Sequence, residues 1–406
     1  MTKCLICQAE YRAFVDFGLM PIANGFAKLE ELSDEYLFPM KVGFCENCKM
    51  VQLVEQPERE RMFHSEYAFY SSTSTFMKQH FLDTYKKFVK QKNLNQSSFV
   101  VEIGCNDGIF LSNFVESGVP CLGVEPSSNV ADVAREKGIE VVCEFFDKEL
   151  GQKIVAENGN VDLIFSANVM CHIPYMHSIY EGIKLCLKPD GIFVFEDPYL
   201  GEVIQKNSFD QIYDEHVFLF SAIAVKNLAE RHGLELFDVE PQITHGGSMR
   251  YFLGHKNSNP LTSRAIDLLE KERELGLDQS SKYQKFADEV DHIKDELICL
   301  LTKLVREGKK VVGYGATSKS TTVTNYFGIT PDLVGAIYDT TPIKQNKVSP
   351  GAHIPILPYA EFRESEPDYV LLFAWNHAAE IMEKEKTFME EGGRKWITYI
   401  PEVKVT

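Results

Sequence analysis

The chain lacks several features that would place it in common classes of protein. No apolar run approaches the 18 residues that a membrane helix needs, and the first residues, MTKCLICQAEYR, lack the apolar core of a secretory signal peptide. The formal charge of −17 leaves no basic excess for a phosphate backbone, so no nucleic-acid partner is expected. We therefore expect a cytoplasmic protein with no membrane or nucleic-acid partner, in which a few local cations could still hold a phosphorylated small molecule.

The chain also lacks tandem repeats, and its 406 residues with 44% hydrophobic content suffice for two or three domains. Composition divides it into a cysteine-bearing block at 1–65, a block of strand-helix units at 66–255, and a charged helical stretch with a further α/β domain at 256–406. Apolar residues recur every three or four positions from 286 to 304, which indicates a helix packed on a neighbouring layer; a partner-binding helix is the alternative. The oligomeric state cannot be read from the sequence.

Cysteine occurs at ten positions, but the pattern does not indicate a disulfide framework, and reduced thiols are expected. Each of two Cys-x-x-Cys pairs places two thiolates on one tight turn, so together they can enclose a structural zinc ion in a tetrahedral sulfur shell. The identical spacings favour this site over four unrelated thiols. The expected zinc ligands are Cys4, Cys7, Cys45 and Cys48. The other six cysteines adjoin apolar runs and are expected to be small buried side chains.

Residues 100–114, VVEIGCNDGIFLSNF, form the most informative segment. A β-branched run, a turn with Gly104 and Gly108 and an amphipathic stretch predict a strand, a turn and a helix, and a second short strand ends in Glu125. Nucleotide folds use this arrangement, because glycine lets the backbone approach the ligand and the acid accepts the ribose hydroxyls. The alternative is a structural turn that binds no ligand.

A carboxylate, Glu102, precedes the turn, where it would repel a pyrophosphate but suits an ammonium or a sulfonium group. S-adenosylmethionine is therefore the expected cofactor rather than NAD, with its ribose on Glu125, its adenine near Phe145 and Phe146, and its amino-acid end near Glu102. The expected cofactor-binding residues are Glu102, Gly104, Asn106, Gly108, Glu125, Phe146, Ala167 and Asn168.

Apolar runs at 138–146, 161–173 and 187–200 are separated by segments of helical length, which predicts repeated strand-helix units and a parallel sheet. A further strand, glycine turn and helix are expected at 309–328. The predicted fold class is α/β: a central Rossmann-like domain that binds S-adenosylmethionine, a small N-terminal zinc domain and a C-terminal Rossmann-like α/β domain.

Residues 213–221, YDEHVFLFS, combine a phenol, two carboxylates and an imidazole after the fifth predicted strand, where a parallel sheet places its active-site loops. A histidine beside acids can have the near-neutral pKa that a general base needs. The alternative is a helix cap, with Asp214 or another polar residue capping a helix that begins near Val217. His172 follows the fourth strand, and a catalytic and a core role are equally open for it. The residues expected at the surface or in packing are His80, His232, His292 and His353.

Together these motifs resemble the sugar C-methyltransferases that act on nucleotide-linked 4-keto-6-deoxyhexoses, as in tetronitrose and mycarose biosynthesis, and the resemblance covers the whole chain. CLIC and CENC resemble the family's zinc-binding domain, and EYAFYSSTS at 66–74 resembles the start of its central domain. EIGCNDG and GVEPSS match its S-adenosylmethionine site, and YDEHVFLFS matches its Tyr-x-Glu-His segment. GYGATSKSTTVTNY resembles its C-terminal signature, but begins GYGATSKSTT where the family is closer to GYGAAAKGNT. The nucleotide base, the sugar or its 4-keto state can therefore differ from those of the best-known members.

The resemblance implies an S-adenosylmethionine-dependent methyltransferase that transfers a methyl group to carbon 3 of a nucleotide-linked keto-deoxysugar. In this mechanism His216 removes the proton beside the 4-keto group, Glu215 orients or polarises it, and neighbouring side chains donate to the enolate oxygen. The implied catalytic residues are His216, Glu215, Tyr213, His172 and one of Tyr67 and Tyr70. The expected substrate residues, in a cleft between the central and C-terminal domains, are Tyr314, Gly315, Lys319 and Asn325.

Two other functions stay open at this point. One is an O- or N-methyltransferase on a nucleotide sugar, and the other is a non-catalytic zinc-bearing scaffold that binds no S-adenosylmethionine. The intact residues of the glycine turn and Glu125 disfavour the scaffold. The sequence does not identify the hexose, the nucleotide base, the pathway or the methylated position.

Overall fold

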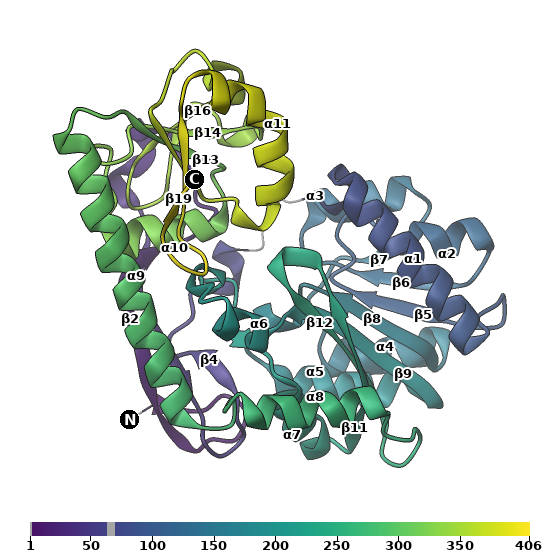
Figure 1. Ribbon diagram of the computed structural model, residues 1–406. Coiled ribbons are helices and arrows are strands. Elements are labelled where there is room, and N and C mark those ends of the chain that lie inside the picture. The colour runs from purple at the N-terminus through teal and green to yellow at the C-terminus, as the bar shows by residue number, and fades with distance from the viewer. Residues whose placement is uncertain (1, 63–69) are drawn as a thin grey trace.

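The computed structural model describes residues 2–62 and 70–406, which form three β-sheets surrounded by helices (Figure 1). The central sheet and its helices lie on one side of the view. The N-terminal strands and the C-terminal domain lie on the other side, where the long helix α9 (Ser280–Arg306) runs beside both. Among the described residues, none of the helices combines the length and the apolar character that a membrane span requires.

The N-terminal sheet is antiparallel and takes its last strand from the middle of the chain. Its strands in spatial order are β1 (Thr2–Lys3), β2 (Glu10–Pro21), β3 (Leu37–Phe44), β4 (Val51–Leu53) and β10 (Phe218–Leu219). Because β10 follows His216 closely, its pairing with β4 ties the segment 213–221 to the cysteine-bearing block. Apolar side chains of β2 and β3 share one core with α9 and the C-terminal sheet, so this small sheet is not packed on its own.

The central sheet has the order β11-β12-β9-β8-β5-β6-β7, with parallel pairing from β7 to β9 and antiparallel pairing of β12 and β11. The strand order reverses at β5, and ligands of open α/β sheets bind at the carboxyl ends beside such a reversal. The strands are β5 (Val100–Ile103), β6 (Cys121–Val124), β7 (Glu140–Val142), β8 (Val161–Ala167), β9 (Leu187–Pro198), β11 (Leu234–Gln242) and β12 (Ser248–His255).

Helices bury both faces of this sheet, and successive strand residues alternate between two apolar clusters. Val101, Ile103 and Ile164 belong to one cluster, whereas Val100 and Leu163 belong to the other, which explains the continuous apolar runs in the sequence. The first cluster includes α4 (Lys148–Asn158), α5 (Met176–Cys186), α7 (Ala222–Arg231) and α8 (Ser263–Glu274), and the second includes α1 (Thr75–Lys92), α2 (Ser112–Ser117) and α3 (Ser128–Glu136). The short helix α6 (Leu200–Gln205) follows β9.

The C-terminal sheet has the order β15-β16-β14-β13-β17-β18-β19, parallel except for its two edge strands. Its elements are β13 (Val311–Tyr314), α10 (Ser318–Phe327), β14 (Ile337–Asp339), β15 (Lys347–Val348), β16 (Pro355–Pro358), β17 (Tyr369–Leu372), α11 (Ala378–Glu391), β18 (Lys395–Thr398) and β19 (Lys404–Val405). Helix α9 buries Phe286, Val290, Ile293, Leu297 and Leu301 in the core shared with β2 and β13, as the packing interpretation of its apolar periodicity predicts.

Candidate active site

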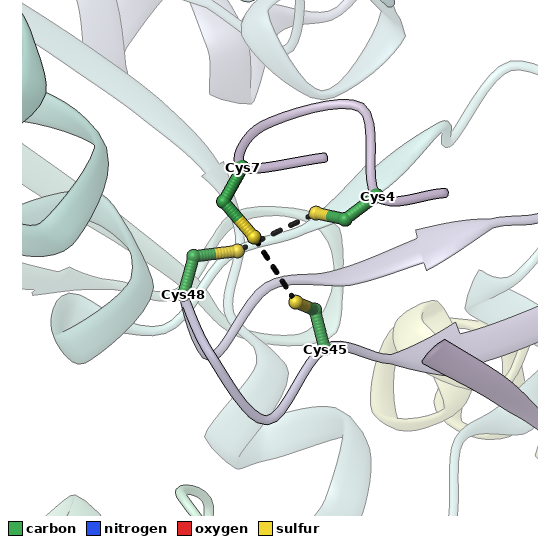
Figure 2. Close-up of side chains that lie close together, drawn as sticks. All are labelled: Cys4, Cys7, Cys45 and Cys48. Carbon is green, nitrogen blue, oxygen red and sulfur yellow. Dashed lines mark hydrogen bonds between the residues drawn. The ribbon is translucent and has the colours of Figure 1, made fainter. Parts of the chain in front are cut away.

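The two Cys-x-x-Cys turns face each other beside the N-terminal sheet (Figure 2). Sγ of Cys4 lies 3.5 Å from Sγ of Cys48, Sγ of Cys7 lies 3.4 Å from Sγ of Cys45, and all four sulfurs lie within 4.8 Å of one another. Tetrahedral zinc with Zn–S bonds of about 2.3 Å has sulfur-sulfur edges of roughly 3.8 Å, so the four thiols fit a closed zinc shell.

A cleft opens at the carboxyl end of the central sheet, where the strand order reverses. Its space is about 880 Å³, including the part open to solvent. Most lining residues follow β5, β6 and β8, and the segment after β7, the loop between β11 and β12 and helix α1 also contribute. Six of the eight expected cofactor residues line the cleft: Gly104, Asn106, Glu125, Phe146, Ala167 and Asn168.

The turn after β5 needs glycine at two positions for different reasons. Gly104 has a φ of 72°, and a Cβ built on it would lie 2.3 Å from Cγ2 of Val169, so a side chain would collide with the loop after β8. Gly108 has a φ of 77°, and its Cβ would lie 2.2 Å from Cδ1 of Ile139. Gly108 is not among the residues that line the cleft, so its glycine serves the packing of the turn on its neighbours.

Glu125 ends β6 with its carboxylate held by the backbone. The N–H of Asn106 donates to Oε2 at 3.0 Å, and the N–H of Ser127 donates to Oε1 at 2.9 Å. Burial raises the pKa of Glu125, whereas these backbone hydrogen bonds lower it. Each oxygen retains a lone pair, and the side chain lines the cleft, which suits an acceptor of two ribose hydroxyls.

Glu102 lies beneath the turn and does not line the cleft. Its side chain is buried, and its Oε2 has no hydrogen-bond partner in the described part of the chain. Burial, and then the charges of Glu125 and Asp107, raise the pKa of Glu102 well above its usual range, which disfavours the charged form. A contact of Glu102 with the cofactor stays a prediction.

Three histidines gather beside the cleft. His172 lines it from a short 3-10 turn after β8 (Met170–His172), and its ring stacks on that of His216 with centroids 5.4 Å apart and planes at 20°. The ring centroid of Tyr213 lies 4.1 Å from that of His216. His245 lines the cleft from the loop between β11 and β12. The structure therefore brings Tyr213, His172 and His216 together at the edge of the cleft.

The hydrogen bond of His216 determines which of its ring nitrogens can accept a proton. The side chain is buried, and its Nδ1 lies 2.6 Å from the carbonyl oxygen of Gln211. Because a carbonyl oxygen only accepts, Nδ1 carries the proton and the neutral ring presents a lone pair on Nε2. Burial, and then the charges of His172 and Lys319, lower the pKa of His216 well below its ordinary value, so the ring is neutral at pH 7.

Nδ1 of His216 is hydrogen-bonded to Gln211 and not to Glu215, so orientation or polarisation of the base by Glu215 stays a prediction. Oε1 of Glu215 accepts a hydrogen bond from Nδ2 of Asn24 at 2.9 Å, and Oγ of Ser318 donates to Oδ1 of the same Asn24 at 2.9 Å. Asn24 thus connects the segment that carries His216 to helix α10, and Glu215 positions that segment against the N-terminal domain.

Asp214 has a similar anchoring role, and the helix-cap alternative is wrong. Its Oδ1 accepts a hydrogen bond from the N–H of Ala23 at 2.9 Å. The residues after Val217 form strand β10, and the next helix begins at Ala222, with Oγ of Ser221 accepting from the helix N-terminus.

Of the two candidate tyrosines, Tyr67 lies outside the described residues. The hydroxyl of Tyr70 accepts a hydrogen bond from Nδ2 of Asn129 at 3.0 Å, in the first turn of α3. Helix α3 follows β6 and Glu125, so Tyr70 lies on the β6 side of the cleft, whereas His172 follows β8.

Among the expected substrate residues, Lys319 lies in the first turn of α10, with Nζ 5.7 Å from the ring centroid of Trp375. Its charge lowers the pKa of His216 and His245, although burial has the larger effect on both rings. Asp210 lies between the central and C-terminal domains, where its Oδ2 accepts hydrogen bonds from Trp375 Nε1 at 2.7 Å and from the hydroxyl of Tyr399 at 2.7 Å. Lys319 therefore faces the histidines from the C-terminal domain.

The other three expected substrate residues are engaged within the C-terminal domain. Tyr314 is buried, and its hydroxyl donates to Oε1 of Glu385 at 3.3 Å. Nδ2 of Asn325 donates to the carbonyl oxygen of Thr321 at 2.8 Å. Gly315 has a φ of 89°, which the turn after β13 requires. These contacts favour structural roles, and substrate binding by the three residues stays a prediction.

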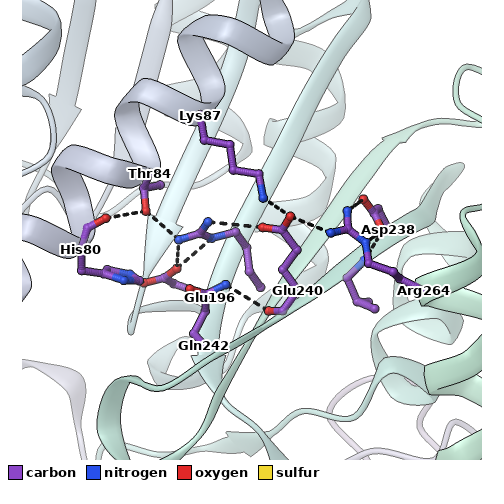
Figure 3. Close-up of polar contacts among 10 residues, drawn as sticks. His80, Thr84, Lys87, Glu196, Asp238, Glu240, Gln242 and Arg264 are labelled. Carbon is purple, nitrogen blue, oxygen red and sulfur yellow. Dashed lines mark hydrogen bonds and ion pairs between the residues drawn. The ribbon is translucent and has the colours of Figure 1, made fainter.

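A charge network with Glu196, Glu240 and Arg250 buried at its centre fastens α1 to the central sheet (Figure 3). Nε2 of His80 lies 2.6 Å from Oε1 of Glu196, while Nε and Nη2 of Arg250 donate to Oε2 of Glu196 at 2.9 and 2.7 Å. Glu240 accepts from Lys87 and, at 3.0 Å, from Nη1 of Arg264. Because α1 also carries Met77 and Phe81 of the cleft lining, this network holds one wall of the cleft.

Replacing Arg250 by methionine is expected to lower the free energy of unfolding by about 3–5 kcal/mol, because it leaves Glu196 charged and buried without its cation. Although burial raises it, the charge of Arg250 and the hydrogen bond of His80 hold the pKa of Glu196 to about 2, below the ordinary 4.5. This stabilisation is complete above pH 4.5 and is lost as the pH falls toward 2.

Urea unfolding at pH 7 and at pH 4 measures this effect. Lys303→Met, which removes an exposed ion pair of α9, is the control and should cost less than about 1 kcal/mol. If the two variants were equally stable, the network would have no structural importance.

His245 was not among the predicted site residues, although it stands beside two glycines. The contribution of α1 to the cleft was not predicted either, because no local pattern shows where that helix folds back. His80, expected at the surface or in packing, instead pairs with Glu196. The expectation of buried cysteines is wrong for Cys143 and Cys299, which are exposed.

Comparison with known proteins assigns the three parts of the chain. A zinc binding domain model matches residues 4–63, a methyltransferase domain model matches 75–239, and a C-methyltransferase C-terminal domain model matches 243–401. The chain is 34% identical over 406 residues to the C-methyltransferase NovU of Streptomyces niveus, covering 99% of this chain and 96% of that protein.

Two further matches cover part of the chain. A tRNA U34 carboxymethyltransferase of Helicobacter pylori (strain HPAG1) is 26% identical over 224 residues, which is 51% of this chain and 74% of that protein. The crystal structure of magnesium protoporphyrin IX methyltransferase (ChlM) from Synechocystis PCC 6803 with bound SAM matches 44% of this chain and 79% of its own, with a TM-score of 0.33 and 12% identity.

The full-length relative and the three domain matches confirm the expected family, fold class and cofactors. The cleft at the strand reversal fits S-adenosylmethionine, and the four clustered thiols fit zinc. The chain belongs to the C-methyltransferase family and is an S-adenosylmethionine-dependent C-methyltransferase with an N-terminal zinc-binding domain.

Proposed function

We propose that the acceptor is a nucleotide-linked 4-keto-6-deoxyhexose and that the methyl group is added to its carbon 3. The observation that carries this proposal is the buried, neutral His216 with its open Nε2 in the cluster beside the cofactor cleft. A carbon beside a carbonyl becomes a nucleophile only after it loses a proton, so a carbon methyltransferase needs such a base.

The neighbours of His216 provide the remaining functions. His216 accepts the carbon-3 proton on Nε2, while Tyr213 and His172, which contact its ring, can donate hydrogen bonds to the oxygen of the resulting enolate. S-adenosylmethionine, when bound, supplies an electrophilic methyl group. In this proposal residues 1–65 bind zinc and residues 66–255 bind S-adenosylmethionine. Residues 256–406 help to hold the nucleotide through Lys319 at the N-terminus of α10.

Glu125 is proposed to hold the cofactor ribose. Glu125→Ala is expected to weaken S-adenosylmethionine binding by roughly 1–3 kcal/mol, because two hydroxyls lose their charged acceptor. Calorimetry measures the change, with Glu140→Ala as a control that removes one exposed carboxylate from the nearby strand β7. Equal affinity of the two variants would contradict the placement of the ribose.

The proposed substrate is tested by incubating the protein with labelled S-adenosylmethionine and a panel of nucleotide-linked 4-keto sugars. We expect label on a carbon of the sugar, identified by the carbon skeleton of the product. Methylation of a sugar oxygen or nitrogen alone would overturn the proposal, and so would transfer to none of the keto sugars.

A further inference from the structure

The loop between β11 and β12 stands at the same edge of the sheet as the cleft. Because β12 is antiparallel to β9, Ser248 at its start pairs with Pro198 at the end of β9. Residues 243–247 therefore lie beside the carboxyl ends of the parallel strands, where ligands bind in this class of fold. His245 is the residue of this loop that lines the cleft.

The backbone at His245 is strained and is held in place by several partners. Its φ of 54° and ψ of 21° lie in the left-handed region, which residues other than glycine rarely adopt. Nε2 of Gln211 donates to the carbonyl oxygen of His245 at 2.5 Å, and Nζ of Lys206 donates to that of Gly246 at 2.7 Å. Trp375 occupies the space in which a side chain on Gly246 would lie. Strain that the surroundings enforce in this way is typical of functional sites.

The order of the strands places His245 in the half of the cleft where the methyl-accepting substrate is proposed to bind. Going along the sheet from β6 through β5, β8 and β9 to β12, Glu125 marks one end and His245 the other. With the ribose on Glu125 and the adenine near Phe146, which follows β7, the methionine end of the cofactor would lie toward β5 and β8. His172 follows β8 and stacks on His216, so the proposed base lies in the same half as His245.

The ring of His245 is suited to donate a hydrogen bond. Burial, and then the charge of Lys319, lower its pKa to about 4, so the imidazole is neutral at pH 7 and carries one N–H. Within residues 2–62 and 70–406 its ring nitrogens make no hydrogen bond to the protein.

We propose that His245 is a further catalytic residue: its imidazole donates a hydrogen bond to the substrate oxygen that becomes negative when His216 removes the carbon proton. This rests on the proposed function. In that step the proton moves from carbon 3 to Nε2 of His216, the C–H electron pair becomes the carbon-carbon π bond, and the carbonyl π pair moves onto oxygen. His245 keeps its own proton and lowers the energy of the oxyanion.

Two substitutions that accept the left-handed backbone test this role. His245→Gly removes the ring, whereas His245→Asn keeps an N–H donor. We expect the glycine variant to lose about 100-fold or more in kcat, as enzymes do on losing one oxyanion donor, with S-adenosylmethionine affinity within about threefold of wild type. The asparagine variant should recover at least about tenfold of this loss, and added imidazole should partly rescue the glycine variant. His292→Asn, on the exposed side of α9, is the control.

The outcomes separate this inference from the proposed function. Carbon methylation at a wild-type rate by His245→Gly overturns the inference and leaves the proposed function standing. Equal losses in both variants without rescue by imidazole, or a matching loss of S-adenosylmethionine affinity, also overturn the donor role. If wild-type protein methylates only oxygen or nitrogen, the proposed function fails and the enolate role fails with it.

Discussion

Replacement of His216 by asparagine is expected to lower turnover by about two orders of magnitude or more while both ligands bind with near-normal affinity. Asparagine can still donate a hydrogen bond to the carbonyl oxygen of Gln211, but it has no basic nitrogen for the carbon-3 proton. Steady-state kinetics and calorimetry measure the two effects. His292→Asn is the matched control, because this side chain is 72% exposed on α9.

Proton exchange separates the base from other causes of lost activity. In heavy water, wild-type enzyme with a demethylated cofactor analogue should exchange the carbon-3 proton, and His216→Asn should not. Tyr213→Phe should cost less, since a neighbouring donor or water can replace its hydroxyl. Full activity of His216→Asn would instead assign the base to His172 or to a tyrosine.

The lowered pKa of His216 also predicts the pH dependence. The ring must be neutral to accept a proton, and burial holds its pKa well below the ordinary 6.5. Activity should therefore persist as the pH falls through 6.5 and decline only at lower pH. An acid limb centred at 6.5 would show that the base is an ordinary, solvated histidine.

Local patterns were sufficient for the parts of the site that depend on neighbouring residues. The glycine turn, Glu125 and the paired cysteines are short segments whose geometry their own residues dictate, and the structure brings each set together. The closeness of His172 and His216 agrees with one general rule, since both segments were placed at the carboxyl edge of a parallel sheet; the stacking of their rings was not predicted.

Contacts between distant segments were not predictable. Glu215 was expected to orient or polarise His216, which stays a prediction; its hydrogen bond with Asn24, 191 residues away in the sequence, is a pairing that no local pattern encodes. The side-chain direction of Tyr314 likewise depends on helix α11, which carries Glu385. For Glu102 the raised pKa was not predictable, because its burial and the neighbouring acids that raise the pKa arise only in the fold.

Loss of zinc is expected to destabilise the protein strongly. We predict about one zinc per chain, and Cys45→Ser should lower the free energy of unfolding by several kcal/mol, since structural zinc contributes about 10–16 kcal/mol in small domains. Metal analysis and thermal unfolding with and without a chelator measure these effects. Cys299→Ser, at an exposed cysteine of α9, is the control and should be neutral. An absence of zinc, or equal stability of the two variants, would contradict the structural assignment.

Cys45→Ser should affect S-adenosylmethionine affinity and turnover unequally. The lining of the cofactor cleft includes no residue from 2–62, so S-adenosylmethionine affinity should change little in Cys45→Ser at a temperature where the chain stays folded. Turnover should fall, because Ala23 and Asn24 of the zinc-bearing domain anchor Asp214 and Glu215 beside the proposed base. Calorimetry and kinetics on one preparation distinguish the two effects. A parallel loss of affinity and turnover would instead mean that zinc supports the fold of the whole molecule, without a specific effect on the segment that carries His216.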